Sequence, residues 1–389
     1  MPPSKSIADW SQQVHEHFPH LSRPQAYVLA LYSYAALALH CCGQSQVAGF
    51  LARLLQLKDA TIRQRLREWT WEIQAKRGPK RQEVVVASCF APLLNWVLSG
   101  WARQERRLAL ALDATTLKEN VVVLSISVLY GGCAIPVAWQ VLPANQPGAW
   151  RPHWLALLAQ LQQQIPADWQ VLVLADRGLF ADWLFRAIQA LQWHPFLRIN
   201  TDGHCQVQGD HAFQPLRRLL PAPHQAWSKP VVCFKQSQLP ATLLIYRDEA
   251  HDHPWLILTD LPPDVALIAW YSLRAWIEAQ FKDLKRGGWQ WQRTRMTDPE
   301  RVSRLWLVLA VALLYSVSLG SQAEAEPPAN LLAELPPTHV ARRTATGRTQ
   351  PRRLSLVTQG YLDFLVRLIR NQHLPAVRFQ LPNLWPAHL

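Results

Sequence analysis

The region that begins at residue 108 constrains the fold more than any other part of the chain, because three long apolar runs follow one another there. Residues 108–114 read LALALDA, residues 121–130 read VVVLSISVLY and residues 134–142 read AIPVAWQVL. Apolar runs of this length predict strands, and the Gly-Gly pair between the second and third runs predicts a hairpin turn. Since the runs lack polar alternation, the sheet that they form should be covered on both faces.

Helices and strands alternate after the third run. The pattern predicts a helix over 149–164, a strand over 171–176, a helix over 180–191 and a strand over 196–200. The resulting order, β-β-β-α-β-α-β, predicts an α/β fold with a mixed sheet.

The rest of the chain divides by composition. Short β-like runs that Pro, Gly, His and Asp separate predict a β-rich insertion after the last of these strands. Helical patterns dominate the region before the sheet, where the basic stretch 76–81 fits either DNA binding or a solvated loop. Five Arg between 342 and 353 precede a final helix near 355–371. The predicted divisions are a helical N-terminal domain (1–107), the two parts of the α/β core (108–200 and 266–320), the insertion (201–265), and a basic C-terminal region that could contact DNA or a second copy (321–389).

The charge of the chain favours a polyanionic partner. It carries 40 Lys and Arg against 27 Asp and Glu, a net charge of +13, and nucleic acid is the commonest polyanion. Six cysteines without a C-x-x-C pair favour reduced core cysteines in a cytoplasmic protein. The polar N-terminus is unlike a signal peptide. The apolar run Leu305–Leu319 is short and interrupted, which favours a buried helix over a membrane span.

Two aspartates follow apolar strands. Asp113 ends the first run, and Asp176 ends the strand over 171–176. Neighbouring strands would bring the two carboxylates together, where they repel each other unless a cation neutralises them. Mg²⁺ prefers oxygen ligands, and two such ions can serve phosphodiester chemistry. Taken alone, however, each aspartate is better explained as a turn or cap residue.

The segment 271–285, YSLRAWIEAQFKDLK, places its polar groups on one side of a predicted helix. At 100° per residue, five polar side chains fall within an arc of about 80°, and the apolar ones lie opposite. A lone carboxylate among cations and a phenol can complete a metal site while its neighbours hold backbone phosphates. The alternative is a solvated face with ion pairs at i−4 and i+4. The five residues are Tyr271, Arg274, Glu278, Lys282 and Lys285.

The same segment resembles the Y-(2)-R-(3)-E-(6)-K signature of the IS4-type insertion-sequence transposases. Asp113 with the following Thr-Thr pair resembles the first acidic motif of that family, and Asp176-Arg177-Gly178 resembles the second. The resemblance covers about residues 108–320, including the R-x-x-D-P-E-R run at 295–301. The signature positions are Tyr271, Arg274, Glu278 and Lys285.

This resemblance implies an RNase H-like catalytic fold with a β-rich insertion before the glutamate helix. It implies that Asp113, Asp176 and Glu278 hold two divalent ions, Mg²⁺ or Mn²⁺. A water would nick DNA at the end of the element, and the freed 3′-hydroxyl would attack either the opposite strand, giving a hairpin, or target DNA. The implied partners are double-stranded DNA (terminal inverted repeats and target) and a second copy on paired ends, without a membrane. The expected location is the prokaryotic cytoplasm, at the nucleoid. The residues expected to contact DNA are Tyr271, Arg274, Lys282 and Lys285.

Some features depart from the family pattern or leave alternatives open. Ala275 follows the signature Arg where many members carry Trp, and Leu179 follows the D-R-G glycine where an aromatic residue is common. Trp255 could stack on a flipped base, although a core role explains it better. Two other functions stay open: an RNase H-like nuclease or junction resolvase that cuts without joining, and a DNA-binding repressor that keeps the fold without catalysis.

Overall fold

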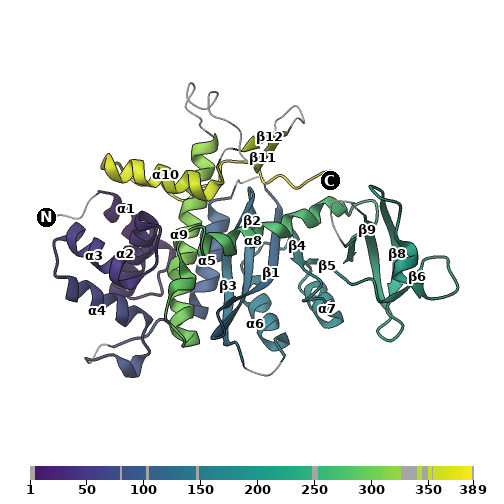
Figure 1. Cartoon of the computed structure of the whole chain (residues 1–389), viewed down its shortest axis with the longest axis horizontal. Helices are drawn as coiled ribbons and strands as arrows, with labels where there is room; N and C mark the ends of the chain where they lie inside the picture. The colour runs from purple at the N-terminus through teal and green to yellow at the C-terminus, as the bar shows by residue number, and fades with distance from the viewer. Residues whose placement is uncertain are drawn as a thin grey trace.

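A ten-stranded sheet forms the centre of the molecule, with helices around it (Figure 1). The computed structural model describes residues 5–78, 81–101, 105–145, 149–247, 253–325, 340–343, 349–352 and 354–387. The strand order across the sheet is β3-β2-β1-β4-β5-β10-β9-β8-β6-β7. The strands are β1 Arg107–Leu117, β2 Val121–Tyr130, β3 Cys133–Pro143, β4 Gln170–Ala175, β5 His194–Arg198, β6 His204–Val207, β7 Gln214–Pro215, β8 Ala226–Cys233, β9 Leu239–Tyr246 and β10 Trp255–Thr259.

The first five strands form the predicted core. β1, β2 and β3 are antiparallel neighbours, whereas β4 and β5 run parallel to β1. Gly131 and Gly132 close the β2–β3 hairpin with φ of 56° and 88°, a conformation that glycine adopts without steric cost. Three antiparallel strands followed by two parallel ones in the order 3-2-1-4-5 make the RNase H-like arrangement. The predicted fold class is therefore confirmed.

The β-rich region extends this sheet instead of forming a sheet of its own. β10 pairs antiparallel with β5 through Ile257↔Arg198 and Leu258↔Leu197, and the remaining strands follow outward from β10. Figure 1 shows β6, β8 and β9 at the end of the molecule opposite the N-terminal helices. Backbone hydrogen bonds to β5 thus fix the insertion beside the core strands.

Helices cover the sheet and form the N-terminal region (Figure 1). Alternating side chains of β1 pack on opposite faces: Leu110 and Leu112 belong to the cluster that includes α6 and α7, while Ala109 and Ala111 pack with the segment 268–277. The α-helices are α1 Lys5–His17, α2 Arg23–Leu39, α3 Gln44–Leu55, α4 Asp59–Thr70, α5 Phe90–Ser99, α6 Arg151–Gln162, α7 Asp182–Ala190, α8 Trp276–Leu284, α9 Pro299–Ala325 and α10 Leu356–Ile369. Short 3₁₀ turns are η1 Ile73–Ala75, η2 Val86–Cys89, η3 Leu216–Leu219, η4 Ile268–Ala275 and η5 Trp291–Arg293.

The helix α9 is the buried helix that the sequence predicts, although it is longer and runs from Pro299 to Ala325. By length and composition alone it could cross a membrane, but its most apolar window is entirely buried inside the molecule. It lies between the N-terminal helices and the sheet (Figure 1). All six cysteines are buried thiols, as the sequence predicts.

The C-terminal helix α10 crosses α9 at very close range. A Cβ atom on Gly360 would lie 1.8 Å from the carbonyl oxygen of Ser316, and one on Gly320 would lie 1.9 Å from that of Leu356. The Ser316 hydroxyl donates to the Val357 carbonyl at 2.8 Å. Glycine on both helices is what permits this contact.

The basic stretches that the sequence singles out are only partly described. A two-stranded hairpin, β11 Val340–Arg343 and β12 Thr349–Arg352, precedes α10. The side chains of the five Arg between 342 and 353 lie outside the described residues, as do Pro79 and Lys80 of the stretch 76–81.

Candidate active site

Asp113 and Asp176 lie on adjacent strands at the same level of the sheet. β1 and β4 pair in parallel up to Leu112↔Ala175, so the two aspartates are the next residues on either side. Side chains alternate between the two faces of a strand, and both aspartates therefore point to the face that the segment 268–277 covers. Residues far apart in sequence are thus brought together by strand register.

The predicted position of Asp113 at the end of its strand is wrong. β1 continues to Leu117 and pairs with β2 along residues 114–117. Backbone hydrogen bonds to β2 keep these residues extended after β4 has ended. What ends at Asp113 is the pairing with β4, and this leaves room beside the carboxylate on one edge of β1.

The segment that carries the signature is not one helix. Ile268–Ala275 forms the 3₁₀ helix η4, and only Trp276–Leu284 is α-helical. A 3₁₀ helix has three residues per turn, so the angular spacing assumed from the sequence fails in the first half. Leu273 and Ile277 are nevertheless fully buried against the sheet. The predicted apolar side is therefore confirmed, and it holds the polar side over the two aspartates.

Arg274 joins two of the three acids. Its Nη2 lies 2.7 Å from Oδ2 of Asp113, and its Nη1 donates to Oε1 of Glu278. The side chains of Arg274 and Asp113 are 14% and 20% exposed, whereas Glu278 is 62% exposed. The Arg274 guanidinium thus neutralises both Asp113, the most buried of the three carboxylates, and Glu278, the most exposed one.

Asp176 has two partners of its own. The Tyr271 hydroxyl donates to its Oδ1 at 3.3 Å, and Nη1 of Arg198 lies 3.6 Å from the same atom. Arg198 comes from β5 and was not predicted as a site residue. The only signal in the sequence was its place near the end of the next predicted strand. It also donates to the carbonyls of His253 and Pro254, so it connects the site to the start of β10.

The two lysines of the segment 271–285 that were predicted to contact DNA differ in their surroundings. Nζ of Lys285 donates to Oγ1 of Thr115 at 2.7 Å and lies 5.8 Å from the centre of the Trp291 ring. Burial lowers the pKa of Lys285. Lys282 is exposed, and within the described residues its ammonium makes no hydrogen bond or ion pair. The structure thus brings Lys285 to the acids through Thr115 and leaves Lys282 on the surface of α8.

The charges of the site act on one another. Burial raises the pKa of Asp113, and the negative charges of Asp176 and Glu278 raise it further, while Arg274 opposes both effects. Burial works to lower the pKa of Arg274, but the surrounding acids outweigh it and the pKa is raised. Burial and the charge of Asp176 raise the pKa of Tyr271. The three acids therefore share one electrostatic environment.

The donor atoms fit a divalent cation in chemistry but are held apart by the guanidinium. Mg²⁺ and Mn²⁺ take carboxylate oxygens, and Asp113, Asp176 and Glu278 provide them, with the negative charges of the latter two raising the pKa of Asp113. In the described part of the chain, no three His, Cys, Asp or Glu side chains lie close enough to hold a metal ion. Arg274 occupies the position between Asp113 and Glu278, so ion binding requires these carboxylates to turn away from it.

Trp255 lies next to the site. Its ring centre is 5.2 Å from that of Tyr271 at an interplanar angle of 73°, and the side chain is half-buried. The two residues that depart from the family pattern are Ala275, which is exposed at the end of η4, and Leu179, which is half-buried. Phe180, next to Leu179, packs on Phe234 of the insertion with ring centres 5.4 Å apart.

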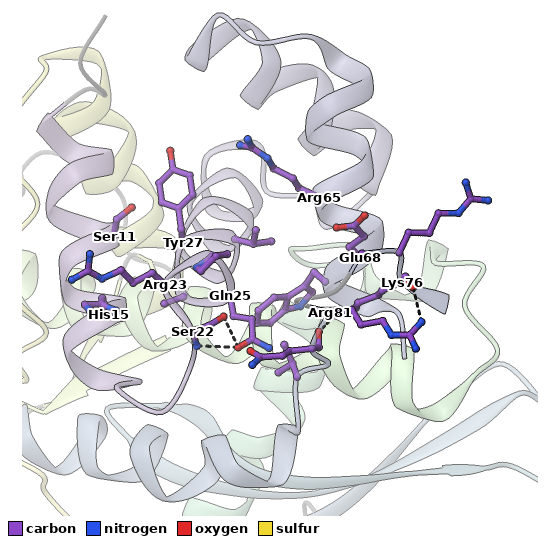
Figure 2. A pocket seen from close by; sticks show the side chains of 18 of the residues that line it. Ser11, His15, Ser22, Arg23, Gln25, Tyr27, Arg65, Glu68, Lys76 and Arg81 are labelled. Atoms are coloured by element: carbon purple, nitrogen blue, oxygen red, sulfur yellow. Dashed lines mark hydrogen bonds between the residues drawn. The ribbon is translucent and has the colours of Figure 1, made fainter. Parts of the chain in front are cut away.

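A basic groove lies among the N-terminal helices (Figure 2). Its volume is about 1160 Å³, and α1, α2, α4 and the loop that follows α4 line it. Figure 2 shows Arg23 and Arg65 reaching from different helices, with Tyr27 between them. The basic residues that line it are His15, Arg23, Arg65, Lys76, Arg77 and Arg81, against Glu68 as the acidic one.

Comparison with known proteins finds a family model that matches part of the chain. The family model described as "Transposase DDE domain" matches residues 136–315, from β3 into α9. This stretch contains Asp176 and Glu278, and Asp113 precedes it. Among solved structures, a chain of the cryo-EM structure of a piggyBac transposase synaptic complex with hairpin DNA is similar over 88% of this chain and 85% of that chain, with 10% identity and a TM-score of 0.37. No curated protein matches the chain. Over residues 136–315 the chain is therefore similar to transposase DDE domains.

Proposed function

We propose that this chain is a cut-and-paste DNA transposase in which Asp113, Asp176 and Glu278 hold two Mg²⁺ or Mn²⁺ ions. The observation that supports this most is the convergence on one sheet face of two register-matched aspartates and a glutamate, with one guanidinium joining Asp113 to Glu278. An ordinary turn or cap role explains neither aspartate, because each is engaged by a cation or phenol from another element.

When bound, divalent ions would lower the pKa of a water and stabilise the departing oxygen. The side chains around the acids have separate roles. Arg274 and Arg198 hold the carboxylates and offer their guanidinium forks to a phosphate. Tyr271 orients Asp176. Lys285, close to Asp113 through Thr115, provides a further positive charge toward the DNA backbone.

The reaction has two steps at phosphorus. In the first, a water loses a proton and its oxygen forms a new P–O bond to the phosphate that joins the element to the flanking DNA. The bond from that phosphate to the 3′-oxygen of the element's last nucleotide breaks, and this oxygen takes up a proton and leaves as a hydroxyl. In the second, that 3′-hydroxyl loses its proton, its oxygen attacks a phosphate of another strand, and that strand's own 3′-oxygen leaves. The number of phosphodiester bonds is unchanged in the second step, so no external energy source is needed.

The surfaces around the site fit the same function. The basic groove of the N-terminal helices is proposed to contact the DNA of the element's ends, because its lining carries far more positive than negative charge. Transposition of two ends further requires two copies of the chain, and we propose self-association on paired DNA ends. The proposed location is the prokaryotic cytoplasm, where both ends and target are found.

The test uses DNA that flanks the coding sequence and carries short inverted repeats. Wild-type protein is incubated with labelled end DNA, a supercoiled target plasmid and Mg²⁺, and the products are separated by size. A transposase gives cleaved ends and ends joined to target. Cleavage without joined products identifies a nuclease or resolvase, and binding without cleavage identifies a repressor. Either of these outcomes overturns the proposal.

A further inference from the structure

A second basic pocket lies where the N-terminal helices meet the segment that follows α8. Its volume is about 600 Å³, and it is lined by residues of α3, α4, the segment 290–298 and the start of α9. It shares no lining residue with the groove of the N-terminal helices and contains none of the three acids. It therefore calls for an explanation separate from both.

Arginines dominate the charge of this pocket. Arg301 is partly neutralised by Glu72, with Nε 3.5 Å from Oε1, and Arg293 donates to the side chain of Gln290. Arg67 and Arg295 are exposed, and among the described residues neither guanidinium has a hydrogen-bond or ion-pair partner. The pocket thus offers unneutralised donors from two parts of the chain. The lining arginines are Arg67, Arg293, Arg295 and Arg301, with Asp298 as the acidic residue.

Asp298, the acidic residue of the lining, accepts a backbone hydrogen bond at the start of α9. Oδ1 of Asp298 accepts from the backbone N–H of Arg301 at 2.8 Å and so caps the first turn of α9. The helix α3 also starts at the pocket, and its N-cap residue Gly43 supplies no side-chain acceptor. The first N–H groups of this 12-residue helix add partial positive charge to that of the arginines.

Two backbone hydrogen bonds connect the lining of this pocket to the segment that follows α8 and to Lys285. The backbone N–H of Gln290 donates to the carbonyl of Lys285 at 3.0 Å, and that of Cys42 donates to the carbonyl of Trp289 at 3.0 Å. The segment 290–298 is therefore joined to Lys285, whose ammonium contacts Thr115. The bond from Cys42 joins the same part of the chain to the N-terminal helices.

We propose that this pocket binds backbone phosphates of the duplex DNA that enters the active site, and that it holds the DNA at the junction between the N-terminal helices and the catalytic domain. This inference rests on the proposed function. Arg67 comes from α4 and Arg295 from the segment 290–298, so together they contact phosphates that one duplex presents to both parts of the protein. Guanidinium groups suit this task because each can donate two parallel hydrogen bonds to a phosphate.

The test compares two double variants that remove the same charge. Arg67→Ala with Arg295→Ala removes the free arginines of the pocket, and Arg218→Ala with Lys235→Ala removes two exposed cations of the insertion, away from the pocket and the basic groove. Binding of a labelled 40-base-pair duplex is measured by fluorescence anisotropy between about 50 and 200 mM KCl. Each lost phosphate contact lowers the slope of log K against log salt by about 0.9, so the pocket variant should lose about 1.8. The control should keep the wild-type slope.

The outcomes separate the pocket from the function. A pocket variant with the affinity and slope of the control overturns the phosphate assignment while wild-type DNA binding stands. A wild-type protein that binds no duplex overturns the proposed function itself. The single charge reversal Arg295→Glu, checked for an unchanged melting temperature, should weaken binding more than Arg295→Ala; equal binding by the two contradicts the proposal. If free phosphate is the ligand instead, millimolar phosphate raises the melting temperature of the wild type at constant ionic strength, and the pocket variant binds DNA like the control.

Discussion

The guanidinium of Arg274 organises the candidate site at the scale of single residues. Its two terminal nitrogens contact different carboxylates, one from β1 and one from α8. A lysine ammonium is a single point charge on a flexible stem and cannot hold both in a fixed orientation. The identity of this residue therefore matters as much as its charge.

Arg274→Lys should lower the single-turnover rate of end cleavage about 10- to 100-fold, since hydrogen bonds to charged groups contribute about 1.5 to 3 kcal/mol each. The matched control is Arg186→Lys on α7, where the exposed arginine donates to the Ser237 carbonyl and, among the described residues, to no carboxylate. Cleavage rates within twofold of the wild type for both variants would show that charge alone suffices at position 274.

Asp283 is a half-buried carboxyl group that the site does not use. Burial raises its pKa to about 6, and the Lys282 ammonium opposes this. The unfolded chain ionises the group near its ordinary value of 3.8. Because the folded pKa is raised, the wild-type free energy of unfolding falls as pH rises from about 4 to 6 and stays lower above that range.

Asp283→Asn removes this penalty and should stabilise the protein by about 2 kcal/mol at pH 7.5, but by less than about 0.5 kcal/mol at pH 4. Urea unfolding at the two pH values measures the difference, with the exposed Asp264→Asn as control. A stabilisation of equal size at both pH values would disprove the role of burial.

The sequence predicted much of the site at this scale, but unevenly. The sequence could group four residues because they are close together in the chain and follow a helical periodicity: Tyr271, Arg274, Glu278 and Lys285. Arg198 could not be grouped with them, because its contact with Asp176 depends on which strands are neighbours, and one residue on a strand carries no such information.

At the scale of helices and strands, local sequence patterns predicted some elements, whereas elements that depend on pairing between distant strands could not be predicted. Strands β2 and β3 and the hairpin between them follow from apolar runs and a Gly-Gly turn. The 3₁₀ geometry of η4 did not follow, because helical periodicity in sequence does not separate three from 3.6 residues per turn over eight residues. The continuation of the sheet into β10 depends on two register pairs with β5, which no local pattern reveals.

The crossing of α9 and α10 gives a prediction at this scale. Gly360→Ala places a methyl group against the Ser316 carbonyl, a backbone atom that cannot move aside, and should destabilise the fold by about 3 kcal/mol. Gly49→Ala in α3 meets the flexible end of Arg53 at 3.3 Å and Oδ1 of Asp59 at 4.0 Å, both side-chain atoms, and should stabilise by about 0.5 to 1 kcal/mol. Thermal unfolding of both variants checks the pair. Equal melting temperatures would contradict the close crossing.

The whole molecule presents three features in one arrangement: an acidic site on the central sheet, a basic groove among the N-terminal helices, and a basic pocket at their junction. The net charge of +13 predicted a polyanionic partner but not where it binds. The structure localises the charge because helices distant in sequence pack side by side. In the proposed function, this arrangement holds DNA across the sheet face that bears the acids.

The most direct measurement asks whether the three acids bind the catalytic ions. Asp113→Cys, Asp176→Cys and Glu278→Cys replace a hard oxygen ligand with a soft sulfur, which Mg²⁺ rejects and Mn²⁺ tolerates better. Cleavage of end DNA should fall at least about 100-fold in Mg²⁺ for each variant and recover partly in Mn²⁺, while Asp264→Cys should behave as the wild type in both metals. Wild-type cleavage rates in Mg²⁺ for all three cysteine variants would contradict the account.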